Sequence, residues 1–418
     1  MKKLPAPLTY LAIELSKGFL FALVLTIVAV YRINAAGLTA LDLVLVGTAH
    51  ELTIFVLEIP TGVIADMVSR RTSVILGYLV TGLAFILEGT FPLFWAILGA
   101  NMIWALGTTL VSGADIAWIT DEVGEEKARV LYVRGSQFQM IGGVLGIVTS
   151  VVLGKMSLGL PLVVAGALFL ALGLVLLWGM PETGFQPLSP AEQADRGTTF
   201  GGMLARGVKA FRARPDLAFI FGITALLGMA IEGYDRLWEF HLITNIRFPL
   251  IGALDTVTWL GIITASGLAL GAVANEAVGR GLTSGTHHGS LRSLLLLNGL
   301  LVLGLATFAL ATSFGVALGG YLTIAVLRAL IAPVYLSLIN RGLSPRTRAT
   351  VNSIGTQFDA MGQIVGGPIL GVVAKLYSVR AALLGSAVTQ ASAALLFLRA
   401  ARARQVDTPP VEIPGVEE

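Results

Sequence analysis

The sequence predicts an all-α membrane protein of about twelve transmembrane helices, arranged as two pseudo-symmetric six-helix halves. Its 418 residues are 55% hydrophobic and only 13% charged, with a mean hydropathy of +0.83. A soluble domain carries about 25% charged residues. The apolar segments reach the roughly 20 residues that a helix needs to cross a bilayer. They are far longer than barrel strands, so helices must satisfy the backbone within lipid.

The first span is predicted to be retained rather than cleaved as a signal peptide. Glu14 and Lys17 interrupt the early apolar run, which then continues to Ile33. The twelve spans are expected near residues 8–33, 41–64, 72–92, 94–120, 130–154, 159–179, 216–243, 251–274, 291–311, 314–340, 350–376 and 380–399.

Loop charges predict the orientation of the chain. Most of the 28 Lys and Arg residues fall in loops on the side of the N-terminus. Because basic loops stay in the cytoplasm, both termini are expected there, in a multi-pass protein of the inner (plasma) membrane. A net charge of +3 without a soluble basic domain argues against nucleic acid as a partner.

Composition also excludes several chemistries. The chain has no cysteine, which excludes disulfides, thiol catalysis and iron–sulfur clusters. Its 4 histidines show no spacing typical of a metal site, and no phosphate-binding loop is present, so ATP-driven transport is not expected. No cofactor and no metal are predicted, and no nucleophile–base set supports an enzyme.

Polar stretches predict the domain boundaries. Residues 1–180 form an N-terminal six-helix half, 181–215 a cytoplasmic linker, 216–400 a C-terminal half and 401–418 a disordered tail. Within the linker, Phe200, Leu204, Val208 and Phe211 recur at helical spacing beside basic residues. This pattern predicts an amphipathic helix on the inner leaflet, with an ordinary soluble linker helix as the alternative.

Two short echoes indicate an internal duplication. The run from Gly135 to Phe138 resembles the run from Gly355 to Phe358, and each opens the fifth span of its half. A second echo joins residues 62–66 to residues 271–275. Matches at equivalent places favour a parallel repeat over chance similarity between glycine-rich helices. The glycines of spans five and eleven allow close packing, with helix flexing as the alternative.

The loop after span two resembles the gating loop of the major facilitator superfamily. Gly62, Asp66, Arg70 and Arg71 match the family's glycine, acid and basic pair, whereas Met67 and Ser69 depart from the pattern. The resemblance implies the major facilitator fold and a loop that latches the cytoplasmic side of one conformer. It also implies that spans one, four, seven and ten line the cavity, which leaves Glu88 of span three in a structural role.

Shorter stretches narrow the resemblance. Residues 58–62, 112–118 and 232–238 are similar to macrolide- and tetracycline-efflux-like drug:proton antiporters. That branch implies proton-coupled efflux of amphipathic drugs by alternating access, with antibiotic resistance as its consequence. The expected partners are a small-molecule substrate, protons and the lipid bilayer, and the expected state is a monomer. Transport of one specific metabolite, lipid or siderophore is the alternative, and a transport-inactive receptor is a remote one.

Ionisable residues inside the predicted spans supply the candidate sites, because each costs about 2.5–3.5 kcal/mol to insert. A carboxylate in a low dielectric binds a proton more readily, which suits proton coupling. Glu14 with Lys17, and Glu232 with Arg236, are alternatively neutralising structural pairs. Asp115 has no partner within its own span, which favours a coupling role. The candidates are Glu14, Glu51, Asp115, Glu232, Asp235, Arg236, Arg328 and Asp359.

Overall fold

The computed structural model describes residues 3–187, 215–252, 254–281, 287–339 and 345–403. Within these ranges the chain forms twelve long helical segments and no strands, which confirms the predicted all-α membrane fold. The predicted amphipathic helix at 200–211, most of the linker and most of the tail lie outside the described residues.

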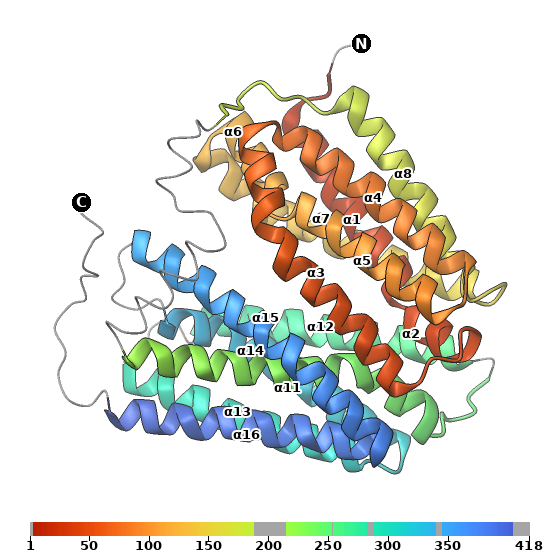
Figure 1. Cartoon of the computed structure of the whole chain (residues 1–418), viewed down its shortest axis with the longest axis vertical. Helices are drawn as coiled ribbons and strands as arrows, with labels where there is room; N and C mark the ends of the chain where they lie inside the picture. Colours follow the sequence, from red (N-terminus) through yellow and green to blue (C-terminus); the bar gives the residue numbers. More distant parts are fainter. Residues whose placement is uncertain (1–2, 188–214, 253, 282–286, 340–344, 404–418) are drawn as a thin grey trace. The chain divides into compact units, whose positions relative to one another are not determined.

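The first six spans contain eight α-helices and one π-helical turn, seen in Figure 1 from red to yellow-green. Their bounds are α1 Ala6–Leu25, α2 Val28–Val30, η1 Tyr31–Ala35, α3 Ala40–Met67, α4 Arg70–Thr90, α5 Phe94–Val111, α6 Ala114–Val123, α7 Glu125–Gly154 and α8 Leu160–Gly179.

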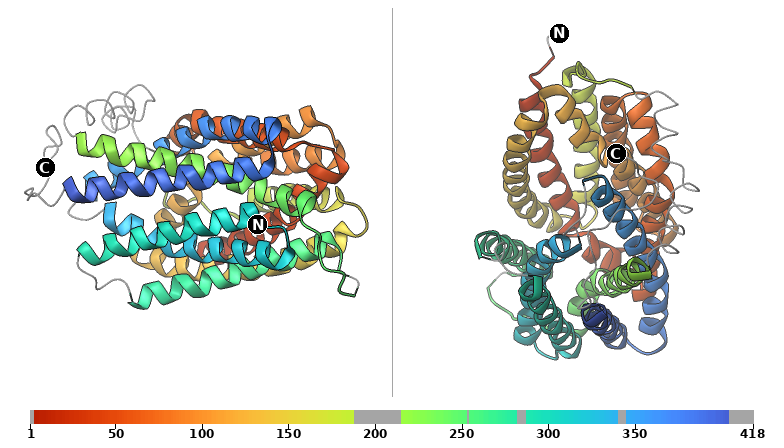
Figure 2. Two further views of the ribbon diagram at one scale, coloured as in Figure 1. Left: turned by 90° about the horizontal axis from the view of Figure 1, so that it is seen from below. Right: turned by 90° about the vertical axis from the view of Figure 1, so that its left-hand side faces the viewer.

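The remaining long helices are α11 Pro215–Asn245, α12 Thr256–Gly281, α13 His287–Leu310, α14 Phe314–Ile339, α15 Pro345–Leu376 and α16 Val379–Ala403. In both views of Figure 2, α11, α13 and α16 run alongside one another. A core cluster joins these helices to α14 and contains Ile223, Leu294, Val334, Ala393 and Phe397.

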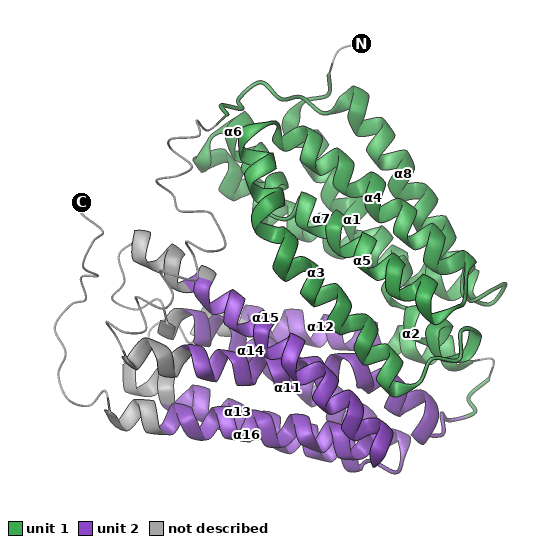
Figure 3. Ribbon diagram, in the orientation of Figure 1, with its two compact units in different colours: residues 1–203, 250–262 green, residues 204–249, 263–418 purple. Residues whose placement is uncertain are grey.

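Contacts divide the chain into two compact units, coloured separately in Figure 3. The first unit comprises residues 1–203 and 250–262, and the second comprises residues 204–249 and 263–418. Ten of the described helical segments are long and apolar enough to cross a membrane. The other two long helices are α11, which carries four ionisable residues between Glu232 and Glu239, and α15. The cytoplasmic location of the termini stays a prediction.

The fourth span differs from its prediction as one continuous helix over 94–120. It is broken between α5 and α6, where Gly113 has a φ of +74°. This left-handed conformation favours glycine because it has no Cβ. The break places Asp115 in the first turn of α6, where the helix dipole stabilises negative charge. The Asp115 Oδ1 atom also accepts a hydrogen bond from the Ile116 backbone N–H, at 2.8 Å.

Glycines reveal the same packing in both units. On α7, Gly142 lies against the backbone oxygen of Leu15 on α1, too closely for a side chain. On α15, Gly362 lies in the same way against the backbone oxygen of Ala225 on α11. The pair α1 and α7 is therefore packed like the pair α11 and α15, which agrees with the repeated motif at the start of α7 and α15. Close helix packing accounts for these glycines.

Candidate functional site

The first unit holds a buried cluster of two carboxylates and one ammonium. The Lys17 Nζ atom lies 2.9 Å from Glu14 Oε1 and 3.0 Å from Asp115 Oδ2. Glu14 is 6% exposed and Asp115 is 5% exposed. The i,i+3 spacing on α1 brings Lys17 to Glu14. The break before α6 brings Asp115 to the same ammonium.

Tyrosines surround this acidic cluster. Gly135 of α7 leaves room for the ring of Tyr10 and the side chain of Glu14, since an added Cβ would lie 2.8 Å and 3.1 Å from them. The Tyr10 ring makes an edge contact with Tyr132, at 6.3 Å between centroids. Tyr78 is fully buried, and its hydroxyl has no hydrogen-bond partner among the described residues.

The charge balance of the cluster defines its chemistry. Two carboxylates share one ammonium, so with every group ionised the cluster carries a net charge of −1. An uncompensated charge in a low-dielectric site is costly. Binding of a proton or a cationic ligand would neutralise this charge. A one-to-one ion pair has no net charge to neutralise. The structure thus brings Glu14 and Asp115 together, and it adds Lys17 as their common partner.

At the equivalent place in the second unit, the described contact joins two hydroxyl groups. Thr224 precedes Ala225 on α11 as Glu14 precedes Leu15 on α1, and both following residues meet the glycines of the repeat. The Thr224 hydroxyl lies 2.7 Å from the Tyr335 hydroxyl of α14. One half thus has an acid–ammonium cluster where the other has a neutral hydroxyl pair.

Among the described residues of the second unit, two ion pairs lie near the middle of α11. The Arg328 guanidinium of α14 donates to both carboxylate oxygens of Asp235, at 2.5 Å and 3.0 Å. The Arg236 Nε atom lies 2.9 Å from Glu232 Oε1. The sequence predicted the second pair from its i,i+4 spacing, whereas the first joins two helices.

A small cavity opens beside Asp235 and Arg328. It encloses about 110 Å³ between α11 and α14. The rings of Trp238 and Tyr321 form part of its wall, with centroids 4.7 Å apart. Its lining consists of Tyr234, Asp235, Trp238, Tyr321, Ile324, Ala325 and Arg328.

The two further candidates are Asp359 and Glu51. Asp359 on α15 accepts a hydrogen bond from Gln363 of the same helix, at 2.7 Å. Glu51 is half-buried on α3. It is not one of the two carboxylates described as pairing with Lys17, which are those of Glu14 and Asp115. Among the described residues, no group of three or more His, Asp or Glu side chains is placed to hold a metal ion.

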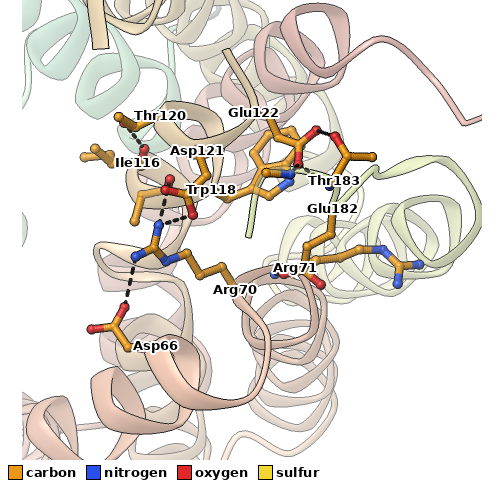
Figure 4. A network of polar contacts seen from close by, with 12 residues as sticks. Asp66, Arg70, Arg71, Ile116, Trp118, Thr120, Asp121, Glu122, Glu182 and Thr183 are labelled. Carbon is orange, nitrogen blue, oxygen red and sulfur yellow. Dashed lines mark hydrogen bonds and ion pairs between the residues drawn. The ribbon is translucent and has the colours of Figure 1, made fainter. Parts of the chain in front are cut away.

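The predicted gating residues form the centre of a polar network at one end of the first unit (Figure 4). The Arg70 guanidinium donates to Asp66 at 3.3 Å, to the Ala117 backbone oxygen at 3.1 Å, and to Asp121 of α6. Gly62 lies half-buried on α3, a turn before Asp66. The Arg71 guanidinium donates to the Leu177 backbone oxygen at 2.5 Å.

A segment after α8, residues 181–185, is bound to this network and is called the strap below. Glu182 accepts from the Arg71 backbone N–H at 2.9 Å and from the Ser69 hydroxyl at 2.7 Å, so it caps the start of α4. Glu122 of α6 accepts from the backbone N–H groups of Thr183 and Gly184, as Figure 4 shows for Thr183. The Trp118 indole donates to the Pro181 backbone oxygen at 2.7 Å.

In the first unit, a third charged group, besides those around Lys17 and Arg70, joins spans one, three and four. The Arg32 Nε atom lies 2.7 Å from Glu88 Oε1, and Asn101 donates to Glu88 Oε2 at 3.0 Å while accepting from Arg32 at 3.0 Å. Tyr31 donates to the Glu88 backbone oxygen at 2.5 Å. Tyr31 and Arg32 lie in the π-helical turn η1. Both carboxylate oxygens and the backbone oxygen of Glu88 thus have partners, which supports a structural role for Glu88.

Sequence reasoning missed three parts of this arrangement. It counted Arg32 among the outer-loop charges, although Arg32 is 9% exposed and paired with Glu88. It assigned Pro181 to Gly184 only to the linker. It also did not recognise Trp238 and Tyr321 as a pair of cavity walls. The acid Glu182 directly after an apolar span was the one signal in the sequence for the strap.

The fold is that of a multi-pass membrane transporter, and the comparisons agree. Residues 11–358 match the Major Facilitator Superfamily, and the chain belongs to that family. Members of this family are secondary transporters that work by alternating access. Among curated proteins, no sequence matches this chain.

Several solved structures share the fold. A mutant of the nucleoside transporter NupG is 14% identical, with a TM-score of 0.78, and the alignment covers 94% of this chain and 99% of that one. A bacterial homologue of the human lysosomal transporter Spinster, inward-facing and unoccupied, is 15% identical, with a TM-score of 0.72 and coverages of 95% and 96%. A POT family transporter bound to a thioalcohol-conjugated peptide is 14% identical, with a TM-score of 0.67 and coverages of 95% and 96%. At these identities the similarity establishes the fold alone.

Proposed function

We propose that this chain is a proton-coupled secondary transporter that exports amphipathic, cationic small molecules across the inner membrane. The observation that carries the proposal is the buried cluster in which Glu14 and Asp115 share the ammonium of Lys17. Two acids held by one base leave one negative charge for a proton or a cation to neutralise.

Antiport follows from competition for that charge. When a proton binds Asp115, the Lys17 ammonium remains with Glu14 and the cluster becomes neutral. When the proton leaves to the other side, a cationic substrate can take its place near the carboxylates. Because the two cations exclude each other, each crossing of a proton drives one crossing of substrate in the opposite direction.

The remaining candidate residues have supporting parts in this mechanism. Asp235 with Arg328, Glu232 with Arg236, and Asp359 belong to the second unit and are proposed to contact substrate. The six-helix halves are proposed to rock against each other about a fixed site. Asp66, Arg70 and Asp121 are proposed to latch the cytoplasmic side, since such ion pairs can open and close between two states.

A second candidate is uptake or export of one specific metabolite. The cavity beside Asp235 and Arg328 favours it, because a small, polar, aromatic-walled space suits a defined ligand better than a broad set of drugs. Solved structures with the same fold include nucleoside and peptide transporters, which gives this candidate a precedent.

Proton-driven flux in proteoliposomes tests the proposal. With an imposed pH gradient, the parent protein should accumulate a fluorescent cationic dye against its gradient and release it when an uncoupler is added. Asp115→Asn should lose the stimulation by the gradient and should also bind the cationic dye more weakly at equal pH on both sides, because Glu14 and Lys17 then form a neutral pair without surplus charge. Glu125→Gln is the matched control, since Glu125 is 83% exposed in a surface pair with Arg129. Transport that survives the uncoupler would remove the antiport mechanism.

A further inference from the structure

The cavity between α11 and α14 is small and partly open. Its volume is about 110 Å³. This is smaller than the core cavity of about 150 Å³ that holds benzene. Because one side is open, a six-membered ring can enter in part while its substituents extend outward.

The apolar wall suits a flat ring. Trp238 and Tyr321 present aromatic surfaces inclined by 35° to each other, and Ile324 and Ala325 complete the wall from α14. Aromatic rings prefer offset or edge contacts with centroids about 4.5–7 Å apart. A ring bound in the cavity can make such contacts with both side chains.

The polar wall is an ion pair in which both side chains are partly exposed. The side chains of Asp235 and Arg328 are 38% and 37% exposed, yet two hydrogen bonds join them as a fork. A ligand with a single charge must pull one partner away and leave the other without its counter-ion. A neutral ligand edge with an adjacent N–H and C=O can instead donate to the carboxylate and accept from a remaining guanidinium N–H.

Tyr234 closes the inner side of the cavity. It is 4% exposed, and its ring makes an edge contact with Phe308 of α13, at 5.6 Å between centroids. This packing fixes the position of the wall on the α11 side.

We propose that this cavity binds a single aromatic ring that carries a neutral carboxamide-type edge. The ring lies against Trp238 and Tyr321, and the N–H and C=O of the edge pair with Asp235 and Arg328 while the ion pair stays intact. The biological meaning rests on the proposed transport function, in which this ring is one end of the transported molecule. The binding itself does not depend on transport.

Four probes of similar size separate the alternatives. Benzamide has the ring and the neutral edge, benzamidine replaces the edge with a cation, benzoate replaces it with an anion, and cyclohexanecarboxamide lacks the aromatic ring. Binding is measured by ligand-observed saturation-transfer NMR on the full chain in nanodiscs, with empty nanodiscs as background. Benzamide is expected to bind best, with each other probe about fivefold weaker, which corresponds to one lost contact.

Variants locate the binding. Trp238→Leu and Arg328→Lys should each weaken benzamide binding, because the first removes a ring surface and the second keeps the charge but loses the fork. Trp95→Leu is the matched control, since Trp95 is 77% exposed on α5 in the other unit. The probe ranking on the parent protein tests the proposal even where a variant fails to fold.

Each other ranking overturns the proposal. Preferred binding of benzamidine indicates a cation site, preferred binding of benzoate indicates an anion site, and equal binding of all four indicates nonspecific partition. Absence of benzamide binding also overturns it. Benzamide binding without any proton-driven flux would leave the cavity proposal standing and remove the proposed antiport, so the two failures can be told apart.

Discussion

The ammonium of Lys17 lies 3.0 Å from a carboxylate oxygen of Asp115, 98 residues further along the chain. This contact joins the first span to the second helix of the fourth span. It turns the local pair of Glu14 and Lys17 into a group of three. Lys17 thereby joins two helices, and two carboxylates share its one ammonium.

Removal of the shared ammonium should destabilise the fold. Lys17→Met leaves Glu14 and Asp115 buried without their counter-ion, and breaking a buried pair in this way costs about 3–5 kcal/mol. The double variant Lys17→Met, Asp115→Asn should recover a large part of the loss, because one surplus charge is gone. Thermal unfolding of the purified proteins in one detergent gives the comparison.

The control for this cycle is Arg129→Met, which breaks an exposed ion pair with Glu125 at 4.0 Å. Exposed pairs contribute about 0–1 kcal/mol, so little change is expected. If the double variant were as unstable as Lys17→Met alone, the cluster would not be coupled in the way that the distances indicate.

The hydropathy pattern predicted the helices because the spans are long and apolar. It did not predict the break in span four, since Ser112 and Gly113 lie in an otherwise apolar stretch and glycine also occurs inside membrane helices. The backbone identifies the break, with a ψ of 120° at Ser112 and a φ of +74° at Gly113, and this break brings Asp115 into the first turn of α6.

Ion pairs within one helix could be predicted from the sequence, whereas ion pairs between helices could not. Spacings of three and four along a helix predicted Glu14 with Lys17 and Glu232 with Arg236, because neighbours on one helix face are fixed by the helix itself. The pairs of Arg328 with Asp235 and of Arg32 with Glu88 depend on how helices pack. No local pattern in the sequence contains that information.

Arg32 and Glu88 should stabilise the first unit without taking part in transport. Arg32→Met leaves Glu88, which is 1% exposed, as an unpaired buried acid, and the expected cost is about 3–5 kcal/mol. Arg32→Met combined with Glu88→Leu should restore much of the thermal stability and keep proton-driven dye flux. Loss of flux in the stable double variant would show that this pair has a further role.

Arg70 should not be replaceable by lysine. Its planar guanidinium reaches Asp66, Asp121 and the Ala117 backbone oxygen together, whereas an ammonium on a flexible stem cannot hold this geometry. Arg70→Lys is therefore expected to lower transport at saturating substrate while thermal unfolding changes little. The matched control is Arg129→Lys, whose guanidinium is 80% exposed and makes a surface pair with Glu125 at 4.0 Å. Equal flux in both variants would contradict a latch at Arg70.

The strap should stabilise the first turn of α4. Glu182 caps that turn from a segment 111 residues further along the chain, in addition to the local cap in which the Ser69 hydroxyl accepts from the Thr72 backbone N–H at 2.9 Å. Loss of a helix cap costs about 0.5–2 kcal/mol. Glu182→Ala should therefore speed amide hydrogen exchange in the first turn of α4 by about tenfold, the factor that corresponds to roughly 1.4 kcal/mol.

The exchange pattern distinguishes the strap from a general loss of stability. With Glu182→Ala, faster exchange should be confined to the first turn of α4 and to residues 117–122, which contact the same strap through Trp118 and Glu122. Glu126→Ala, which changes an exposed acid at the start of α7, is the control and should leave both peptides unchanged. Faster exchange throughout the first unit would instead mean that Glu182 supports the whole bundle. In that case the strap would have no specific action on the network around Arg70.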